Sequence, residues 1–485
     1  MNIKMICRII ALAVLITAAF MLVPLLLAVA DSQPRNIWAY AVAIVAMALL
    51  GSGLLLYSRN GENVFYAQEG FAATGISWIV MSLFGAMPFC FSGEIPNYID
   101  ALFEMVSGFT TTGASILSDV EALSRCNLYW RSFSHWLGGM GMLVFILAVL
   151  PQAKKTAGFG MHLMRAESPG PSVGKLTPHL RQTAMILYGI YILMTATCFV
   201  FLLLGDMPAF EGLCIAFGTA GTGGFGVRNT SMGEYSLYLQ SVVTVFMFLF
   251  GINFSLFYLL LLRQFKTVLK NEELRLYVGI AAGAVILIAL NTYGMYDSGF
   301  LAFHHAAHQV SSIMTTTGFS SVDFEQWPAF SKAILFLLMF IGACAGSTGG
   351  GLKVSRVLLM IKSIRRTIGK ALHPRRVQIV RLDGKMVSEE TSHTVNAYIA
   401  VYLSILLLSF VLISLDGYSI GTNISAVTAC INNIGPGFEL VGATGNYGHY
   451  SAFSKLILSA DMLLGRLEIF PILVLFSADT WSRRR

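Results

Sequence analysis

Long apolar stretches follow one another along nearly the whole chain, separated by short polar segments. A helix needs about 20 predominantly apolar residues to cross the hydrocarbon core of a bilayer, and many windows of that kind occur here. The pattern predicts membrane-spanning helices at Ile9–Ala30, Ile37–Tyr57, Phe71–Phe91, Leu128–Leu150, Gln182–Leu204, Leu237–Leu262, Leu274–Tyr293, Ala333–Leu359, Thr394–Leu415 and Phe453–Phe476.

The first apolar stretch raises a choice between a signal peptide and a retained helix. Lys4 and Arg8 precede it, and Ala28-Val29-Ala30 resembles a signal-peptidase site. The stretch is longer than the roughly 7–15 apolar residues of a usual signal peptide, and another span follows it at once. We therefore expect a retained first helix.

Shorter, moderately apolar stretches lie between the members of the later pairs of spans. At about 1.5 Å per residue, a helix of this length reaches only part of the way through a bilayer. Each stretch is therefore expected to form a half-helix that returns to the side it came from. The four predicted half-helices are Tyr98–Phe109, Ala209–Gly218, Leu301–Ile313 and Ile420–Ile431.

Each half-helix ends at a polar segment that carries glycine. Non-helical backbone is tolerated at membrane depth only where protein buries it or where it lines a water-filled cavity. Four copies predict four quarters of one ring with carbonyl oxygens turned toward an axis, which is how an ion filter is built. Small-residue helix packing, the alternative, would suit a single segment better than four in matching contexts. The segments are Thr110-Thr111-Thr112-Gly113, Ala220-Gly221-Thr222-Gly223, Thr315-Thr316-Thr317-Gly318 and Asn432-Asn433-Ile434-Gly435.

These features predict an all-α polytopic membrane protein. Two leading helices precede four helix–pore helix–filter–helix repeats, arranged with pseudo-fourfold symmetry around one pore. The expected boundaries are residues 1–69 for the leading helices, 70–152, 153–265 and 266–360 for the first three repeats, 361–393 for a basic cytoplasmic linker, and 394–485 for the fourth repeat.

Composition and charge agree with this class. The chain is 56% hydrophobic and only 12% charged, against about 25% charged residues in a soluble domain. The seven cysteines are scattered without a CxxC pair, which supports neither a disulfide framework nor a zinc site. The net charge of +7 comes from lysines and arginines in alternate loops, so it indicates no nucleic acid partner. The positive-inside rule places both termini in the cytoplasm and the filter loops outside.

A glycine-rich segment follows the third filter, from Gly342 to Gly351. Each glycine destabilises a helix interior by about 1 kcal/mol, so this segment should break the helix. A phosphate loop is disfavoured because the GxxxxGK[ST] order is absent, and close helix packing is a further alternative. We favour a mobile loop that obstructs the pore below the filter, formed by Gly346, Ser347, Thr348, Gly349, Gly350 and Gly351.

Arg466 lies within the last predicted span. A charge at the bilayer centre costs roughly 2.5–3.5 kcal/mol, which makes intramembrane charges functional candidates. One hypothesis is an internal ion pair with Asp461 or Glu468. The other is that Arg466 faces the ion path and raises the barrier to cations.

Three further groups of polar residues have weaker signals. His304, His305 and His308 suggest a metal site because positions i and i+4 share a helix face, but wet residues at the outer mouth explain them better. Acidic residues near the outer ends either concentrate cations or are ordinary solvated charges. They are Asp100, Glu104, Asp119, Asp323, Glu325 and Glu439. The basic stretch from Lys353 to Lys385 either binds anionic lipid or docks a cytosolic regulator.

The order of two leading helices and four helix–pore–helix units resembles the Trk/Ktr/HKT superfamily of potassium transporters. The motifs that carry the resemblance are TTTGAS (Thr110–Ser115), TAGTGGFG (Thr219–Gly226), TTTGFS (Thr315–Ser320) and NNIGPGFE (Asn432–Glu439). The resemblance implies a homodimer in a bacterial inner membrane and a cytosolic ring of TrkA-like, nucleotide-binding regulatory subunits. It also matches the 346–351 loop to the family's intramembrane gate, and Arg466 to an arginine of its last pore-lining helix.

The resemblance also implies the ion. Gly113, Gly223, Gly318 and Gly435 match the single filter glycine of each quarter, and glycine at all four places goes with preference for potassium, with rubidium as a surrogate. The fourth segment begins with Asn432-Asn433 rather than the TVGYG of tetrameric potassium channels, so we expect fewer coordinating rings and looser discrimination.

The sequence therefore predicts potassium uptake through a gated, channel-like pore, with potassium as substrate and no cofactor. Transport needs no covalent chemistry, and we expect no enzyme and no catalytic residue. Two alternatives remain open. A sodium- or proton-coupled cation symporter would favour a two-half inverted repeat, and a membrane-embedded enzyme would need a nucleophile or a metal cluster within the spans.

Overall fold

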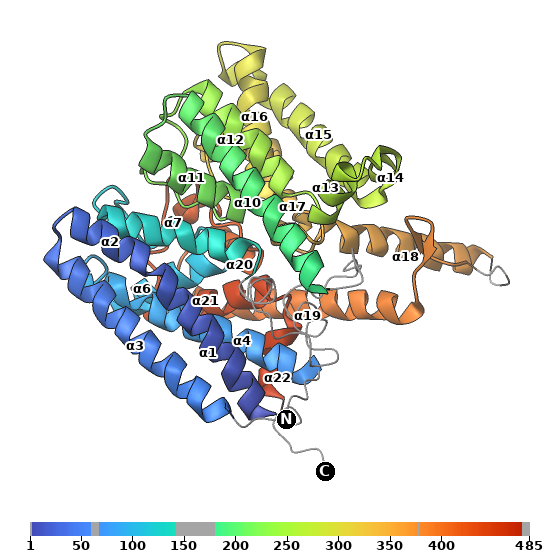
Figure 1. The fold of residues 1–485 in the computed structure, drawn as a ribbon. Coiled ribbons are helices and arrows are strands. Elements are labelled where there is room, and N and C mark those ends of the chain that lie inside the picture. Colours follow the sequence, from blue (N-terminus) through green and yellow to red (C-terminus); the bar gives the residue numbers. More distant parts are fainter. Residues whose placement is uncertain (1, 60–66, 142–179, 374, 376–377, 478–485) are drawn as a thin grey trace.

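The computed structural model describes residues 2–59, 67–141, 180–373, 375 and 378–477. Helices make up most of these ranges, which confirms the predicted all-α class (Figure 1). A small antiparallel hairpin pairs β1 (Arg381–Leu382) with β2 (Lys385–Met386). Several sequence predictions lie outside the described residues: the end of the span predicted to Leu150, the repeat boundary at 152, and the basic loop and tail residues Lys154, Lys155, Arg165, Lys175, Arg376 and Arg483–Arg485.

The two leading spans lie side by side (Figure 1). The first is a 28-residue apolar helical stretch composed of α1 (Ile3–Phe20) and α2 (Leu22–Ala30), and the second is α3 (Pro34–Ser58). One face of α1 is buried, whereas large apolar side chains such as Leu49 and Leu56 of α3 are exposed. An exposed apolar face on a long helix is what contact with lipid requires.

Four helical units follow, and in each a helix of 12–16 residues comes after the first long helix of the unit. The first unit has α4 (Ala67–Gly85), α5 (Met87–Ser92), α6 (Tyr98–Phe109) and α7 (Arg125–Gly139). The second has α10 (Leu180–Leu204), α11 (Ala209–Gly221), α12 (Leu237–Phe250), α13 (Phe254–Leu261) and the short α14 (Phe265–Lys270). The third has α15 (Glu272–Thr292), α16 (Gly299–Met314), α17 (Ala329–Ile341) and α18 (Val354–Leu372). The fourth has α19 (Glu389–Ile413), α20 (Ile420–Ile431), α21 (Ala452–Arg466) and α22 (Phe470–Phe476).

The short helices α6, α11, α16 and α20 are the predicted half-helices. α6 and α20 have the predicted bounds, and α11 and α16 differ from them by at most three residues. Local sequence starts three of them, because the side chains of Asn97, Ser298 and Ser419 accept hydrogen bonds from first-turn amides. At 12–16 residues, they extend about 18–24 Å, which is less than the core of a bilayer.

The helical segments after the second, third and fourth half-helices are interrupted. The continuous spans predicted at Leu237–Leu262 and Phe453–Phe476 are therefore wrong, whereas the break within Ala333–Leu359 falls at the glycine-rich segment where the sequence predicted one. α12 and α13 meet at 92°. The predicted span Ala333–Leu359 consists of α17, a loop and α18, and Phe453–Phe476 consists of α21 and α22. The backbone differs among the three breaks. Asn253 caps the start of α13 after the first, glycines with positive φ (Gly342, Gly346 and Gly351) occupy the second, and Glu468 and Ile469 have positive φ in the last. Within the described residues, six helices are long and apolar enough to span a membrane, or seven with the bent pair.

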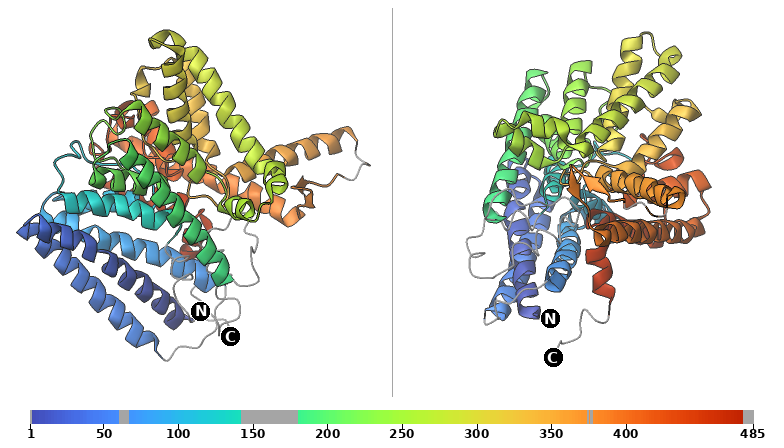
Figure 2. Two further views of the ribbon diagram at one scale, coloured as in Figure 1. Left: turned by 45° about the horizontal axis from the view of Figure 1, so that its top comes forward. Right: turned by 90° about the vertical axis from the view of Figure 1, so that its right-hand side faces the viewer.

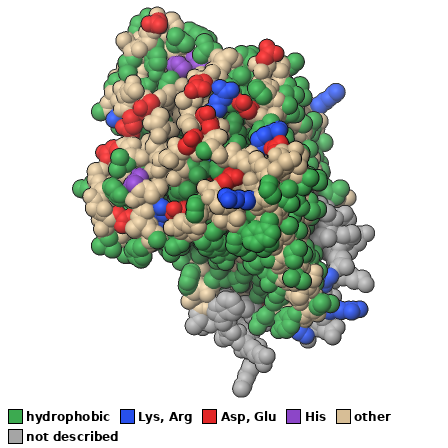
Figure 3. Space-filling view, turned by 90° about the vertical axis from the view of Figure 1, so that its left-hand side faces the viewer, with side chains coloured by type: hydrophobic (Ala, Val, Ile, Leu, Met, Phe, Trp, Pro, Cys, Tyr) green, Lys and Arg blue, Asp and Glu red, His purple; other side chains and the backbone are tan. Residues whose placement is uncertain are grey.

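The surface agrees with a membrane protein. Figure 3 shows one face of the molecule, on which acidic and basic side chains gather over one part while hydrophobic side chains cover most of the rest. The left view in Figure 2 shows α18 projecting from the body. A face dominated by apolar side chains suits contact with lipid.

Candidate functional site

The same tight turn follows all four half-helices. The second residue of each turn has a left-handed backbone: Thr111 (φ 55°), Thr222 (53°), Thr316 (60°) and Asn433 (56°). The amide of the third residue then donates to a carbonyl near the end of the helix. These bonds are Thr112 to Ser107, Gly223 to Gly218, Thr317 to Ser312 and Ile434 to Ala429, at 2.8–2.9 Å. The first and third segments are both Thr-Thr-Thr-Gly, and the other two, which differ from them in sequence, share the same backbone conformation.

A glycine with positive φ closes each turn: Gly113 (80°), Gly224 (74°), Gly318 (89°) and Gly435 (92°). Glycine adopts this conformation without the steric cost that other residues pay. In three segments it is the predicted glycine. In the second segment it is Gly224, one residue after the predicted Gly223.

The second segment therefore runs from Gly221 to Gly224, and Ala220 lies within α11. Two adjacent glycines made the sequence register ambiguous. The aromatic residues carry a signal that resolves it, because Phe225 directly follows Gly224 just as Phe319 directly follows Gly318.

The four glycines form a closed ring. A side-chain carbon placed on any of them would collide with the carbonyl oxygen that immediately precedes the next glycine. The pairs follow chain order and return to the start: Gly113 with Gly223, Gly224 with Thr317, Gly318 with Ile434, and Gly435 with Thr112. The four segments thus meet around one common centre.

The carbonyl oxygens of this ring lack protein donors. Within the described part of the chain, no hydrogen bond ends on the carbonyl of Thr112, Gly223, Thr317 or Ile434, although all four residues are buried. Buried carbonyls in proteins are normally paired. Each half-helix also ends at the ring, so the negative ends of four helix dipoles point toward it. The ring is therefore suited to hold a cation.

Threonine hydroxyls fix the turns instead of facing the ring. The hydroxyls of Thr110 and Thr112 lie 2.7 Å apart, and that of Thr110 also donates to the carbonyl of Val106. Thr315 and Thr317 repeat the pair at 2.7 Å. In the fourth segment, the side-chain amide of Asn433 donates to the Thr112 hydroxyl at 2.9 Å and so links the fourth segment to the first.

A cavity of about 160 Å³ lies at the ring and contacts all four glycines. Its wall also includes Ser115, Asn229, Ser231 and Tyr447, whose hydroxyl donates to the carbonyl of Gly435. Two of the acidic residues near this end form ion pairs: Asp100 with Lys455 at 2.6 Å, and Glu325 with Lys332 at 3.3 Å. Hydrogen bonds from Ser419 and Thr422 lower the pKa of Glu439, which keeps this carboxylate ionised.

Glu104 is different from the outer acids with which the sequence grouped it. It is buried on α6, and its carboxylate forms a 2.5 Å ion pair with the buried Arg131 of α7. The same carboxylate accepts from the hydroxyl of Ser115 and the amide of Ile116. Glu104 is therefore neither a solvated loop charge nor an exposed attractor of cations.

Arg131 carries this contact into the next quarter. It donates to the carbonyl of Gly226 at 3.0 Å, and its guanidinium lies 3.6 Å from the centre of the Phe225 ring. His135, one turn further along α7, lies 2.8 Å from the Gly108 carbonyl and accepts from the Phe225 amide at 3.3 Å. The first and second glycine segments are thus joined from behind by charged and polar side chains.

The three histidines of α16 are buried, so their interpretation as wet residues is wrong. His304 contacts Gln240 at 2.9 Å, His308 contacts Thr244 at 2.8 Å, and His305 contacts Ser321 at 3.1 Å. They join α16 to α12 and to the segment after the third glycine. In the residues that the structure describes, no group of three or more His, Cys, Asp or Glu side chains has the arrangement of a metal site.

The glycine-rich loop between α17 and α18 lies against the third and fourth segments. The Gly350 amide donates to the Thr316 hydroxyl at 2.6 Å, and a side chain on Gly350 would collide with the carbonyl of Asn432. The carboxylate of Glu273, in the first turn of α15, accepts from the amides of Ala345 and Ser355 at 2.7 and 3.1 Å. The loop is thus held at both ends and pressed against the ring.

Arg466 ends α21 beside this loop. Its guanidinium donates to the carbonyls of Gly138 and Gly139 at 2.5 and 2.6 Å and to that of Thr348 at 2.8 Å. Of the two carboxylates suggested as its partners, Asp461 accepts from Ser409 and Glu468 forms an ion pair with Arg356. Arg466 therefore joins the end of α7 to the loop by hydrogen bonds to main-chain oxygens.

Comparisons with known proteins cover nearly the whole chain. The family model named TrkH, described as a cation transport protein, matches residues 38–483. The Trk system potassium uptake protein TrkH of Salmonella typhimurium is 35% identical over 488 residues, which cover 99% of this chain and 100% of that protein. The TrkH protein of Escherichia coli K12 is 34% identical with the same coverage. The crystal structure of the potassium transporter TrkH from Vibrio parahaemolyticus matches with a TM-score of 0.88 and 29% identity, covering 99% of this chain and 100% of that chain.

Proposed function

Because this chain belongs to the TrkH family of cation transport proteins, we propose that it takes up potassium through a gated, channel-like transmembrane pore. The proposal rests on one observation above all, the closed ring of four glycines and four carbonyl oxygens that lack protein donors. The relatives from Salmonella typhimurium and Escherichia coli are also potassium uptake proteins by name. The chain is a multi-pass membrane transporter, and the proposed passage of the ion needs no covalent step.

The proposed path begins in the outer cavity. A potassium ion sheds water there, and the ring carbonyls replace part of its hydration shell. The negative helix ends add a favourable potential. Backbone oxygens held by glycine turns favour potassium and rubidium over the smaller sodium ion when the ring keeps its width. In this reading the second segment contributes Gly221–Gly224.

The loop of residues 346–351 is proposed as the gate, with Arg466 as a barrier beneath the ring. The loop contacts Thr316 and the carbonyl of Asn432, so it has to move before an ion can leave the ring inward. Arg466 adds a positive charge next to the same loop. The membrane potential supplies the driving force, at about 2.3 kcal/mol per charge for each 100 mV.

The assembly is proposed from the family resemblance and the charge pattern. We infer a homodimer in a bacterial inner membrane, with both termini cytoplasmic and a ring of TrkA-like nucleotide-binding subunits controlling the loop. The four units 70–152, 153–265, 266–360 and 394–485 are proposed as the quarters of the pore.

Rubidium uptake into vesicles tests the proposal. The purified chain is reconstituted alone and then with its regulatory subunit, and uptake of rubidium, potassium and sodium is measured under an imposed potential. Uptake of potassium and rubidium above that of sodium is expected. Uptake that requires a sodium or proton gradient would favour a symporter instead, and absence of flux in both preparations would contradict the assignment.

A further inference from the structure

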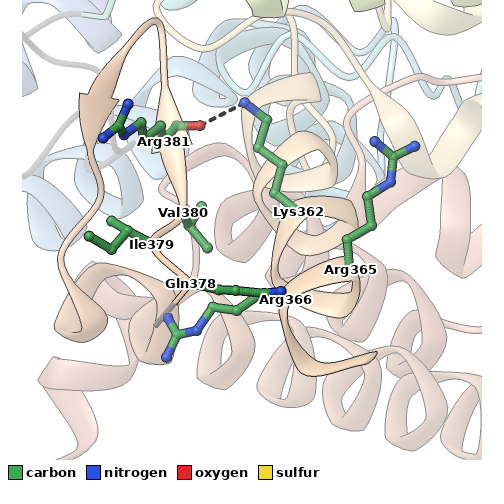
Figure 4. Close-up of a pocket in the computed structure, with 7 residues that line it drawn as sticks. All are labelled: Lys362, Arg365, Arg366, Gln378, Ile379, Val380 and Arg381. Carbon is green, nitrogen blue, oxygen red and sulfur yellow. Dashed lines mark hydrogen bonds between the residues drawn. The ribbon is translucent and has the colours of Figure 1, made fainter. Parts of the chain in front are cut away.

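A basic cavity of about 540 Å³ lies between α18 and the β1–β2 hairpin, away from the ring (Figure 4). Its lining residues are Lys362, Arg365, Arg366, Gln378, Ile379, Val380 and Arg381. Four of the seven carry positive charge and none carries negative charge. Figure 4 shows Lys362 reaching from α18 to the hairpin, with Arg365 on one side of it and Arg381 on the other. A cavity with this lining favours an anion.

The four cations differ in what already neutralises them. Lys362 forms an ion pair with Glu272 and donates to the Arg381 carbonyl at 2.6 Å, and Arg366 pairs with Glu389 at 2.5 Å. Among the described residues, neither Arg365 nor the side chain of Arg381 has a carboxylate partner. Turning these two long side chains toward a bound anion therefore breaks no ion pair. A guanidinium binds phosphate through two parallel hydrogen bonds.

The ion pairs also indicate at which level of the membrane the cavity lies. Glu272 is the first residue of α15 and Glu389 is the first residue of α19, and both helices begin candidate membrane spans. The cavity consequently lies at the ends of two spans, on the side that the basic loops assign to the cytoplasm. This is the level of the phospholipid headgroups.

Apolar side chains accompany the charges on the same helix. Ile364, Ile368 and Leu372 follow one another at four-residue spacing on α18 and are 51%, 55% and 70% exposed. Ile379, which lines the cavity, is 51% exposed. A basic site beside an exposed apolar stripe is typical of a helix that lies in the membrane interface. A small soluble anion has no apolar part that could contact this stripe, whereas a lipid has acyl chains.

The cavity also has a shaped wall. The side-chain amide of Gln378 lies against α18 at Gly369, where any side chain would collide with it. Gly369 thus allows the segment that leads into the hairpin to pack closely against α18. The basic side chains line the cavity beside this contact.

We propose that this cavity binds the phosphate group of an anionic phospholipid from the cytoplasmic leaflet. Arg365 and Arg381 bind the phosphate, Lys362 holds the hairpin to the helix, and the acyl chains lie along Ile364, Ile368 and Leu372. The lipid would thereby connect α18, which continues from the glycine-rich loop, to the membrane surface. The proposal does not depend on which ion the pore takes.

Native mass spectrometry of the delipidated full chain tests the site. Binding of phosphatidylglycerol is compared with that of phosphatidylcholine carrying the same acyl chains. The variant is Arg365→Gln with Arg381→Gln. Its matched control is Lys370→Gln with Lys385→Gln, which removes the same charge from exposed positions of α18 and the hairpin that do not line the cavity. We expect the first pair to weaken phosphatidylglycerol binding by about tenfold or more, and the control pair to weaken it much less.

Three results would overturn the proposal. Equal losses in the two double variants would indicate a diffuse basic surface without a site. Equal binding of the two lipids would remove the role of the anionic headgroup. Displacement of phosphatidylglycerol by inorganic phosphate at equal concentration would indicate a site for soluble phosphate. Rubidium flux in the same preparations is recorded separately, so a failure of the transport proposal is distinguishable from a failure of the lipid site.

Discussion

At the residue scale, the four ring glycines are the positions where a side chain is least tolerated. Gly113→Ser places a side chain against the carbonyl of Gly223 and forces a residue with a Cβ into a φ of 80°. We expect potassium preference over sodium to fall, which the ratio of rubidium to sodium flux measures. Gly53→Ser is the control, because Gly53 of α3 has open space around it and should leave the ratio unchanged.

The register of the second segment gives a second prediction. A side chain on Gly223 would collide with the ring of His135, whereas one on Gly224 would collide with the backbone carbonyl of Thr317. A side chain can be shortened by mutation, whereas a backbone carbonyl cannot. In the His135→Ala background, Gly223→Ala should therefore change rubidium flux much less than it does in the wild type, and Gly224→Ala should change it about as much. A double-mutant cycle on rubidium flux measures both couplings. Equal couplings would mean that the two glycines are interchangeable.

The buried pair of Arg131 and Glu104 gives a third prediction. Arg131→Met leaves a buried carboxylate without its cation, at a cost of about 3–5 kcal/mol of stability. Adding Glu104→Gln removes that charge and should restore much of the thermal stability. The contact with Gly226 stays lost, so the flux ratio should remain altered. Recovery of both properties in the double variant would show that the pair matters for stability alone.

Sequence alone identified the ring glycines in three quarters because one glycine stood alone in each segment. It missed Gly224, since the adjacent Gly223 and Gly224 both suit a tight turn, and the signal that separates them is Phe225 directly after Gly224. It also misplaced Glu104 at the outer mouth. Nothing in the linear order shows that Arg131, which is 27 residues away, reaches this carboxylate.

At the scale of the elements, the loop between α17 and α18 depends on Glu273. This one carboxylate accepts from amides on both sides of the loop. Deleting Gly346–Gly351, or replacing Glu273 with leucine, should raise rubidium flux in the absence of the regulatory subunit because either change loosens the loop. Glu389→Leu, which breaks an exposed ion pair farther along α18, serves as the control. Unaltered flux in a well-expressed deletion variant would contradict the gating role.

The half-helices were predictable and the interruptions largely were not. A half-helix can be recognised in the local sequence from its length, its capping residue and its terminal glycine, as in the segment from Asn97 to Gly113. The break between α12 and α13 falls inside an apolar run that hydropathy reads as one span. Gly251 at this break has a helical backbone, and tertiary contacts hold it, such as the hydrogen bond from the Cys344 amide to the Gly251 carbonyl at 3.0 Å.

At the scale of the whole molecule, the charge pattern assigns each end of the protein to one side of the membrane. Asp119 lies near the outer cavity and Lys385 on the hairpin, and both are exposed. In a background where Cys7 and Cys90 are serine, an impermeant thiol reagent should label Asp119→Cys in intact cells. It should label Lys385→Cys only after permeabilisation. The reverse pattern would invert the proposed orientation and, with it, the direction of uptake.

The ring of four separately encoded segments in one polypeptide has a consequence for how such a protein can change. When identical subunits supply a filter, every mutation is imposed on all four segments at once. Here the equivalent position is threonine in the first and third segments (Thr110 and Thr315), glycine in the second (Gly221) and asparagine in the fourth (Asn432), and the shared turn is kept. A mutation can therefore alter one segment of the ring while the other three keep their sequence. Ion selectivity can then evolve one segment at a time.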